Sequence, residues 1–261
     1  MTKKFLLVVM GAFFLGAAIT YISGDYESLS SNLWNLIPPF AAAVFGILTV
    51  KIYGMTNSHA KSLAFMALGV FFWFLGDFIW FVLEYFLNKN PFPSIADYFY
   101  FTAYPLLLIG LILEVKSNVI KWTYRKAIIV GILSFLLGFI VFYFGVIQAY
   151  DPQENLVNNI VAMTYGIGDL ILIIFTAIIF MVAIGYQKGK LFLPWLSILI
   201  GFSLILVSDI MFAVFRGDYE NFTSIRNIDL GLISGFLLIG YGFFSIGNAL
   251  KEVRKKLVGR I

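Results

Sequence analysis

The sequence predicts an all-α protein, a polytopic membrane helix bundle with eight transmembrane helices. The first observation is composition: 61% of the 261 residues are hydrophobic and 12% are charged, whereas a soluble domain carries about 25% charged residues. The second is that apolar runs long enough to cross a bilayer recur along the whole chain. The third is a charge pattern that separates the two sides of a membrane.

The apolar segments expected to be helical lie near residues 5–22, 33–53, 63–87, 96–115, 126–148, 156–185, 193–215 and 227–250. In that order they have a basic residue at one end, at Lys4, Lys51, Lys61, Lys116, Lys126, Lys188, Lys190 and Lys251. The first segment also has the basic start and apolar centre of a signal peptide. We expect it to be a helix instead, because the internal repeat requires it.

The basic residues predict which side each loop occupies. With eight spans and a cytoplasmic N-terminus, the inner segments hold 15 of the 18 basic residues, and the outer segments hold only Lys89, Arg216 and Arg226. The positive-inside rule then places both termini in the cytoplasm. We therefore expect a multi-pass protein of the plasma (cytoplasmic) membrane, with the tail "KEVRKKLVGRI" touching anionic lipid.

The two halves of the chain resemble each other. "GVFFWFLGDFIWFVLEYF" (69–86) aligns with "GFSLILVSDIMFAVF" (201–215), and "NLWN" (32–35) with "NLVN" (155–158). The pairs Asp77–Asp97 and Asp209–Asp229 are each 20 residues apart. These matches predict a 4+4 tandem parallel repeat, residues 1–120 and 121–261, within one membrane domain.

Acidic residues inside the apolar segments are the main functional signal. Asp77, Asp169 and Asp209 lie well within predicted spans, where each carboxylate costs about 2.5–3.5 kcal/mol on insertion scales. They should therefore face the bundle interior or water. We predict an outward-opening acidic pocket with these binding residues: Asp77, Glu84, Asp97, Tyr100, Tyr104, Asn158, Tyr165, Asp169, Asp209, Arg216 and Asp229.

Bases are scarce at that depth. Buried acids without a base are protonated, hydrogen-bond to tyrosine or asparagine, or bind a cation. An all-oxygen site suits hard cations such as Ca²⁺ or Na⁺, so the expected partners are the lipid bilayer and a small ligand or hard cation; whether a metal binds is left open. Trp73 and Trp80 are expected to face lipid or to pack, rather than to form a cofactor-binding site.

The composition also excludes several classes of site. The chain has no cysteine, so disulfides and thiolate metal sites are absent. Its one histidine, His59, is expected in a short polar loop, which excludes a histidine metal cluster or a Ser-His-Asp triad. No cofactor is expected. The net charge of +4 follows the membrane topology and does not indicate nucleic-acid binding.

The segment "NPFPSIADYFYFTAYPLLLIGL" (90–111) and the preceding "GDFIW" resemble a stretch in multi-spanning sensory domains. Those domains lie in front of diguanylate cyclases and histidine kinases. The resemblance implies a membrane sensor with Asp77 and Asp97 in its signature. No output domain lies within these 261 residues, so such a sensor is expected to signal through a separate partner.

"FLGD" (74–77) and "LVSD" (206–209) are similar to the two acidic helices of the YhhN-type family. That family includes lysoplasmalogenases, membrane hydrolases of vinyl-ether lysolipids. The resemblance implies that Asp77 and Asp209 are a catalytic acid/base pair. Vinyl-ether hydrolysis needs one protonated carboxyl and one carboxylate, which two neighbouring buried acids can supply.

Binding or sensing of a small ligand or cation is the function that the sequence favours. A lysolipid hydrolase and a transporter of cations or small solutes remain as alternatives, so whether the protein is an enzyme is open.

Overall fold

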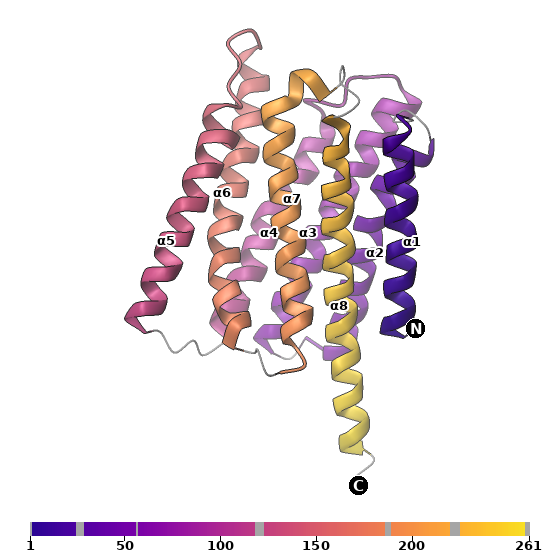
Figure 1. Ribbon diagram of the computed structural model, residues 1–261, viewed down its shortest axis with the longest axis vertical. Coiled ribbons are helices and arrows are strands. Elements are labelled where there is room, and N and C mark those ends of the chain that lie inside the picture. Colours follow the sequence, from indigo (N-terminus) through magenta and orange to yellow (C-terminus); the bar gives the residue numbers. More distant parts are fainter. Residues whose placement is uncertain are drawn as a thin grey trace.

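The structure, a computed structural model, describes residues 2–24, 29–55, 57–117, 123–185, 189–219 and 225–258. Within these ranges the chain forms eight helices that are long and apolar enough to cross a membrane, and no strand. The predicted all-α, multi-pass class is therefore confirmed. The helices run side by side, with the start of α1 and the end of α8 towards the same end of the bundle (Figure 1).

The elements follow one another along the chain, and some spans end in a π-helical turn. They are α1 (Lys3–Ile22), α2 (Leu29–Tyr53), α3 (Ser58–Phe81) with its π-helical turn η1 (Val82–Phe86), α4 (Ile95–Ser117), α5 (Tyr124–Val141) with its π-helical turn η2 (Phe142–Ile147), α6 (Leu156–Gly185), α7 (Phe192–Tyr219), the 3₁₀ turn η3 (Ile225–Ile228) and α8 (Asp229–Val258).

Several helices extend further than the sequence predicted, most of all the start of α3 and the end of α8. The side chain of Asn57 accepts a hydrogen bond from the backbone N–H of Ala60 and so caps α3. As a result α3 begins at Ser58, and His59 lies in its first turn rather than in a loop. At the other extreme, α8 continues to Val258 and projects from the bundle (Figure 1).

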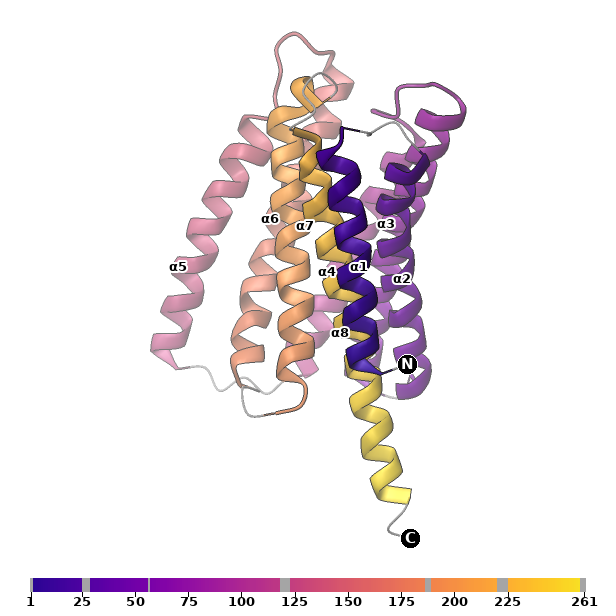
Figure 2. The same ribbon diagram turned by 45° about the vertical axis from the view of Figure 1, so that its right-hand side comes forward.

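The core lies where α2, α3, α4, α7 and α8 pack together. Leu63, Leu107, Ile198 and Phe243 are among its fully buried side chains. In contrast, α5 stands at the edge of the bundle, packed chiefly on α6 (Figures 1 and 2). Most of its apolar side chains are exposed, as expected for a helix that faces lipid.

Glycines let the paired helices approach closely. A Cβ on Gly110 of α4 would lie 2.6 Å from Met66 Cγ and 3.0 Å from the carbonyl oxygen of Ser62 on α3. A Cβ on Gly242 of α8 would lie 2.8 Å from the carbonyl oxygen of Pro194 on α7. Small residues at helix contacts are the usual means of tight packing in membranes.

Candidate functional site

A cavity of about 200 Å³ lies inside the bundle. Trp73 and Phe236 lie deep in it, and its wall reaches exposed Glu84 and the α3–α4 connection at Phe92. It therefore occupies the half of the bundle away from the start of α1 and the end of α8. Its described lining residues are Tyr21, Ser31, Asn32, Asn35, Leu36, Trp73, Asp77, Trp80, Phe81, Glu84, Phe92, Tyr100, Tyr104, Ala162, Tyr165, Ile205, Asp209, Phe212, Ala213, Ile228, Asp229, Leu232 and Phe236.

Carboxyl groups enter the cavity wall from four helical segments. Asp77 comes from α3, Glu84 from the π-helical turn that follows α3, Asp209 from α7 and Asp229 from the first residue of α8. No lysine, arginine or histidine is among the lining residues that the structure describes. The cavity is thus an acidic site in an otherwise apolar bundle.

Two further predicted acids lie directly behind the wall. Asp169 of α6 is 2% exposed and accepts a hydrogen bond of 2.7 Å from Tyr104 Oη. Asp97 of α4 is also buried and accepts from Tyr165 Oη and, at 2.5 Å, from the backbone N–H of Ser94. Both tyrosines line the cavity, so these acids hold the wall in position from behind it.

The acids in the wall itself differ in their hydrogen bonds. Tyr100 Oη donates to Asp77 Oδ1 at 2.7 Å, and Tyr21 Oη donates to Asp229 Oδ2 at 2.8 Å. Asn35 Nδ2 also donates to Asp229, at 3.3 Å. Asp209 receives no hydrogen bond from the part of the chain that the structure describes. Its carboxylate faces the cavity without such a donor.

Aromatic rings make up much of the remaining wall. Trp73 lies edge-to-face with Phe236, their ring centroids 5.9 Å apart, and Trp80 lies edge-to-face with Phe212 at 6.2 Å. Trp80 Nε1 also donates a hydrogen bond of 3.1 Å to Glu84. Trp73 and Trp80 thus pack on neighbouring rings, as the sequence predicted, and both also line the cavity.

One predicted site residue, Asn158, lies away from the cavity and its supporting acids. Asn158 lies in the first turn of α6, where its side chain donates to Glu154 at 2.7 Å. It is absent from the described lining, so it serves the α5–α6 connection instead. The side chain of Arg216 lies outside the part of the structure that is described.

Sequence reasoning missed the contribution of α1 and α2. Tyr21 and Asn35 bond to each other at 2.7 Å and both bond to Asp229. The signal was a pair of asparagines, Asn32 and Asn35, one turn apart in an apolar helix; both line the cavity. In addition, Asn35 Oδ1 is buried and has no hydrogen-bond partner within the described residues.

The described acids of the wall do not gather into one cluster. No group of three Asp, Glu, His or Cys side chains within the described ranges is close enough together to hold a metal ion. A hard cation such as Ca²⁺ needs about six to eight oxygen ligands. The arrangement instead offers separate carboxylates spread over an aromatic wall.

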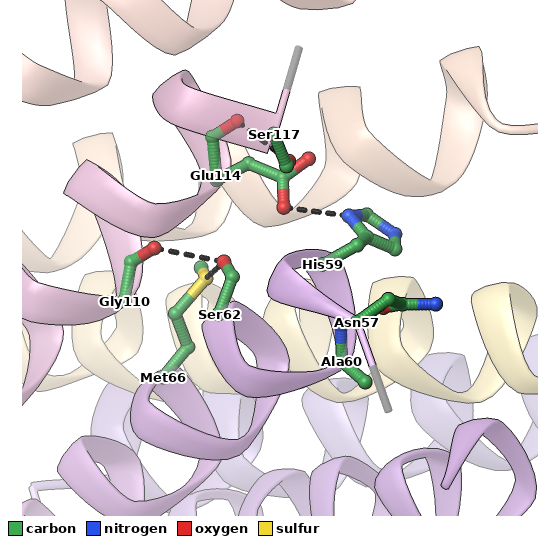
Figure 3. A network of polar contacts seen from close by, with 8 residues as sticks. All are labelled: Asn57, His59, Ala60, Ser62, Met66, Gly110, Glu114 and Ser117. Atoms are coloured by element: carbon green, nitrogen blue, oxygen red, sulfur yellow. Dashed lines mark hydrogen bonds and ion pairs between the residues drawn. The ribbon is translucent and has the colours of Figure 1, made fainter. Parts of the chain in front are cut away.

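A second polar cluster lies at the opposite end of the bundle, outside the cavity (Figure 3). His59 Nδ1 lies 2.6 Å from Glu114 Oε2, joining the start of α3 to the end of α4. Glu114 is 1% exposed, and the ring of His59 packs between Tyr53 and Trp195. The contact links the start of α3 to the end of α4, next to the close approach of these two helices at Gly110.

Comparisons with known proteins give no family for the chain: no protein family, curated protein or solved structure matches it.

Proposed function

We propose that this chain is an integral membrane protein that binds a small ligand in the acid-lined cavity and senses it. The observation that carries the proposal is that Asp77 and Asp209, from different helices, line one cavity in an apolar bundle. Each such acid costs about 2.5–3.5 kcal/mol on insertion scales. Intramembrane acids that face a cavity rather than lipid indicate a functional site.

The proposed orientation places the cavity on the outer side of the membrane. By the positive-inside rule, the distribution of basic residues favours a cytoplasmic location for both termini. The cavity wall is formed by the end of α1, the start of α2 and the start of α8, which belong to the half of the bundle away from the termini. A ligand would then arrive from the extracytoplasmic side of the plasma membrane.

Helix packing supports the proposed 4+4 repeat. α3 pairs with α4 and α7 with α8; between the halves, α2 packs on α8 and α6 on α4. In the proposed repeat α2, α3 and α4 correspond to α6, α7 and α8, so the α3–α4 pair corresponds to α7–α8 and the α2–α8 pair to α6–α4.

Individual contacts of the α3–α4 and α7–α8 pairs support the same alignment. Gly69 faces Leu107 and the carbonyl of Ala103, and Gly201 faces Ile239 and the carbonyl of Gly235, each 132 positions later. Asp209 and Asp229 follow Asp77 and Asp97 by the same 132 positions.

α8 connects the cavity to the opposite end of the bundle. It contributes Asp229, Leu232 and Phe236 to the wall and continues as one helix to Val258, which projects from the bundle (Figure 2). A ligand that shifts the cavity end of α8 would move the projecting end. We propose that this end contacts a separate signalling partner.

The test is a search for ligands that stabilise the protein in detergent. A ligand at 100 times its dissociation constant adds about 2.7 kcal/mol to the free energy of unfolding. We expect stabilisation that is lost in Asp209→Asn and kept in Glu154→Gln, a matched change at an exposed acid. If the ligand stabilises both variants equally, it does not bind at Asp209 in the cavity.

A lysolipid hydrolase is the second candidate, favoured by the fact that both acids of the proposed acid/base pair line the same cavity. Turnover of a vinyl-ether lysolipid by purified protein, abolished in Asp77→Asn and in Asp209→Asn, would establish it. If the protein binds the lysolipid without hydrolysing it, the hydrolase candidate fails and the sensor proposal stands.

A further inference from the structure

We propose that the ligand is a small organic cation, a molecule whose ammonium group is held by Asp77 and Asp209 against the aromatic wall. This inference rests on the proposed function, because it names the ligand class for the same cavity. Four observations support it: the acidic residues of the wall, the volume of the cavity, the aromatic rings around it, and the lack of a described hydrogen-bond donor to Asp209.

The charge of the wall selects for cations. Asp77 and Asp209 lie in the membrane interior, and the described lining contains no basic side chain to neutralise them. Charge lining a cleft with low-dielectric walls raises the local concentration of the opposite charge. An ionised carboxylate in this wall repels an anionic ligand and attracts a cationic one.

The cavity is too large, and its acids too dispersed, for a metal ion alone. One water molecule needs a cavity volume of about 10–15 Å³, and this cavity has a volume of about 200 Å³. No three acidic or histidine side chains within the described ranges form a metal-holding group. A molecule with a charged end and an apolar body fits this shape better than a dehydrated ion.

The rings of the wall suit an ammonium group. Trp73, Trp80, Phe212 and Phe236 line the cavity together with Tyr100. The faces of such rings attract organic cations, and aromatic cages are the common means of recognising quaternary ammonium. An acidic wall without rings would hold a hydrated inorganic ion equally well.

Asp209 differs from the other intramembrane acids because no described tyrosine donates a hydrogen bond to it. Asp77 accepts from Tyr100, Asp97 from Tyr165 and Asp169 from Tyr104. Asp209 takes no hydrogen bond from the described chain, although it lines the cavity on α7. An ammonium N–H or N–CH₃ group would satisfy this carboxylate.

The absence of cysteine makes a direct test practical. Ala213→Cys places one thiol on the cavity wall, one turn after Asp209. Gln153→Cys places one in the exposed α5–α6 connection as a control. Each full-length variant is treated with methanethiosulfonates carrying a trimethylammonium, a sulfonate or a hydroxyl group, and the rates of modification are compared.

We expect the ratio of cationic to anionic rates at Ala213→Cys to exceed the ratio at Gln153→Cys by about tenfold or more. Adding Asp209→Asn should remove most of this preference. Differences in thiol reactivity cancel, because both reagents act on the same variant. A ratio equal to that of Gln153→Cys, or one unchanged by Asp209→Asn, overturns the organic-cation assignment.

The same experiment separates failure of this inference from failure of the proposed function. If all three reagents modify Ala213→Cys at equal rates, the cavity is accessible to water but has no preference for cations. Only the organic-cation assignment then fails. If no reagent modifies Ala213→Cys while Gln153→Cys reacts, water does not reach the cavity and the proposed function itself fails.

A second measurement does not depend on changing Asp209. Choline should slow modification of Ala213→Cys by the hydroxyl reagent, whereas its neutral isostere 3,3-dimethylbutan-1-ol should not. Equal protection by the two compounds would contradict a cation site even if the Asp209→Asn variant does not fold.

Discussion

Tyr104 on α4 donates a hydrogen bond of 2.7 Å to Asp169 on α6. The relationship is reciprocal, because Tyr165 on α6 donates to Asp97 on α4. Each helix thus supplies a tyrosine to the cavity wall and an acid that fixes the tyrosine of its neighbour. These two bonds join the two halves of the chain beside the cavity.

Tyr104→Phe should destabilise the protein. The change leaves Asp169, which is 2% exposed, without the hydroxyl that bonds to it. An unsatisfied buried acceptor costs about 1–3 kcal/mol, so thermal unfolding in detergent should occur at a lower temperature. Tyr98→Phe on the same helix is the control, because Tyr98 is 74% exposed; equal unfolding temperatures would argue against the bond.

Gly110→Ala and Gly242→Ala should each loosen a helix pair by a similar amount. In both, the new methyl group would meet the backbone and a side chain of the partner helix, and such overpacking costs about 1–3 kcal/mol. Gly131→Ala on α5 is the matched control, since no atom lies within 4 Å of its Cβ position. If only one of the two sites is sensitive, the proposed equivalence of the helix pairs fails.

His59→Ala should destabilise the end of the bundle opposite the cavity. The change removes a 2.6 Å contact to Glu114, a carboxyl that is 1% exposed, and we expect a loss of about 1–3 kcal/mol in the free energy of unfolding. Ligand stabilisation should persist, because this cluster lies outside the cavity. Lys61→Ala, at an exposed position two residues later, controls for the helix itself.

The proposed orientation predicts which cysteines an impermeant reagent reaches in intact cells. Gln153→Cys should react from outside, whereas Lys255→Cys, in the projecting end of α8, should react only after the membrane is opened. The reverse pattern would place the cavity on the cytoplasmic side.

The sequence allowed the span number and the principal acids to be predicted for simple reasons. Long apolar runs are sufficient to find membrane helices, and an acid in such a run has few places to face other than the interior. Asp77 and Asp209 were found this way, and both line the cavity. Tyr100 and Tyr104 were predicted from their helical spacing to Asp97, and Tyr165 from its spacing to Asp169.

The remaining parts of the site could not be predicted because helices that are apolar all round do not reveal which face is buried. Trp73 and Trp80 were therefore assigned to packing or lipid. Asn158 was assigned to the site because it lies seven residues before Tyr165 and eleven before Asp169 on one predicted helix face. Asn158, near the start of its helix, bonds to the adjacent connection instead.

The central claim is that water and small solutes reach a cavity beside Asp209, and the rate at which a neutral thiol reagent modifies Ala213→Cys tests it most directly. Leu199→Cys is the reference, because Leu199 lies on the same helix, is 3% exposed and belongs to the core. We expect Ala213→Cys to react much faster than Leu199→Cys. Equal, slow reaction of both would contradict it.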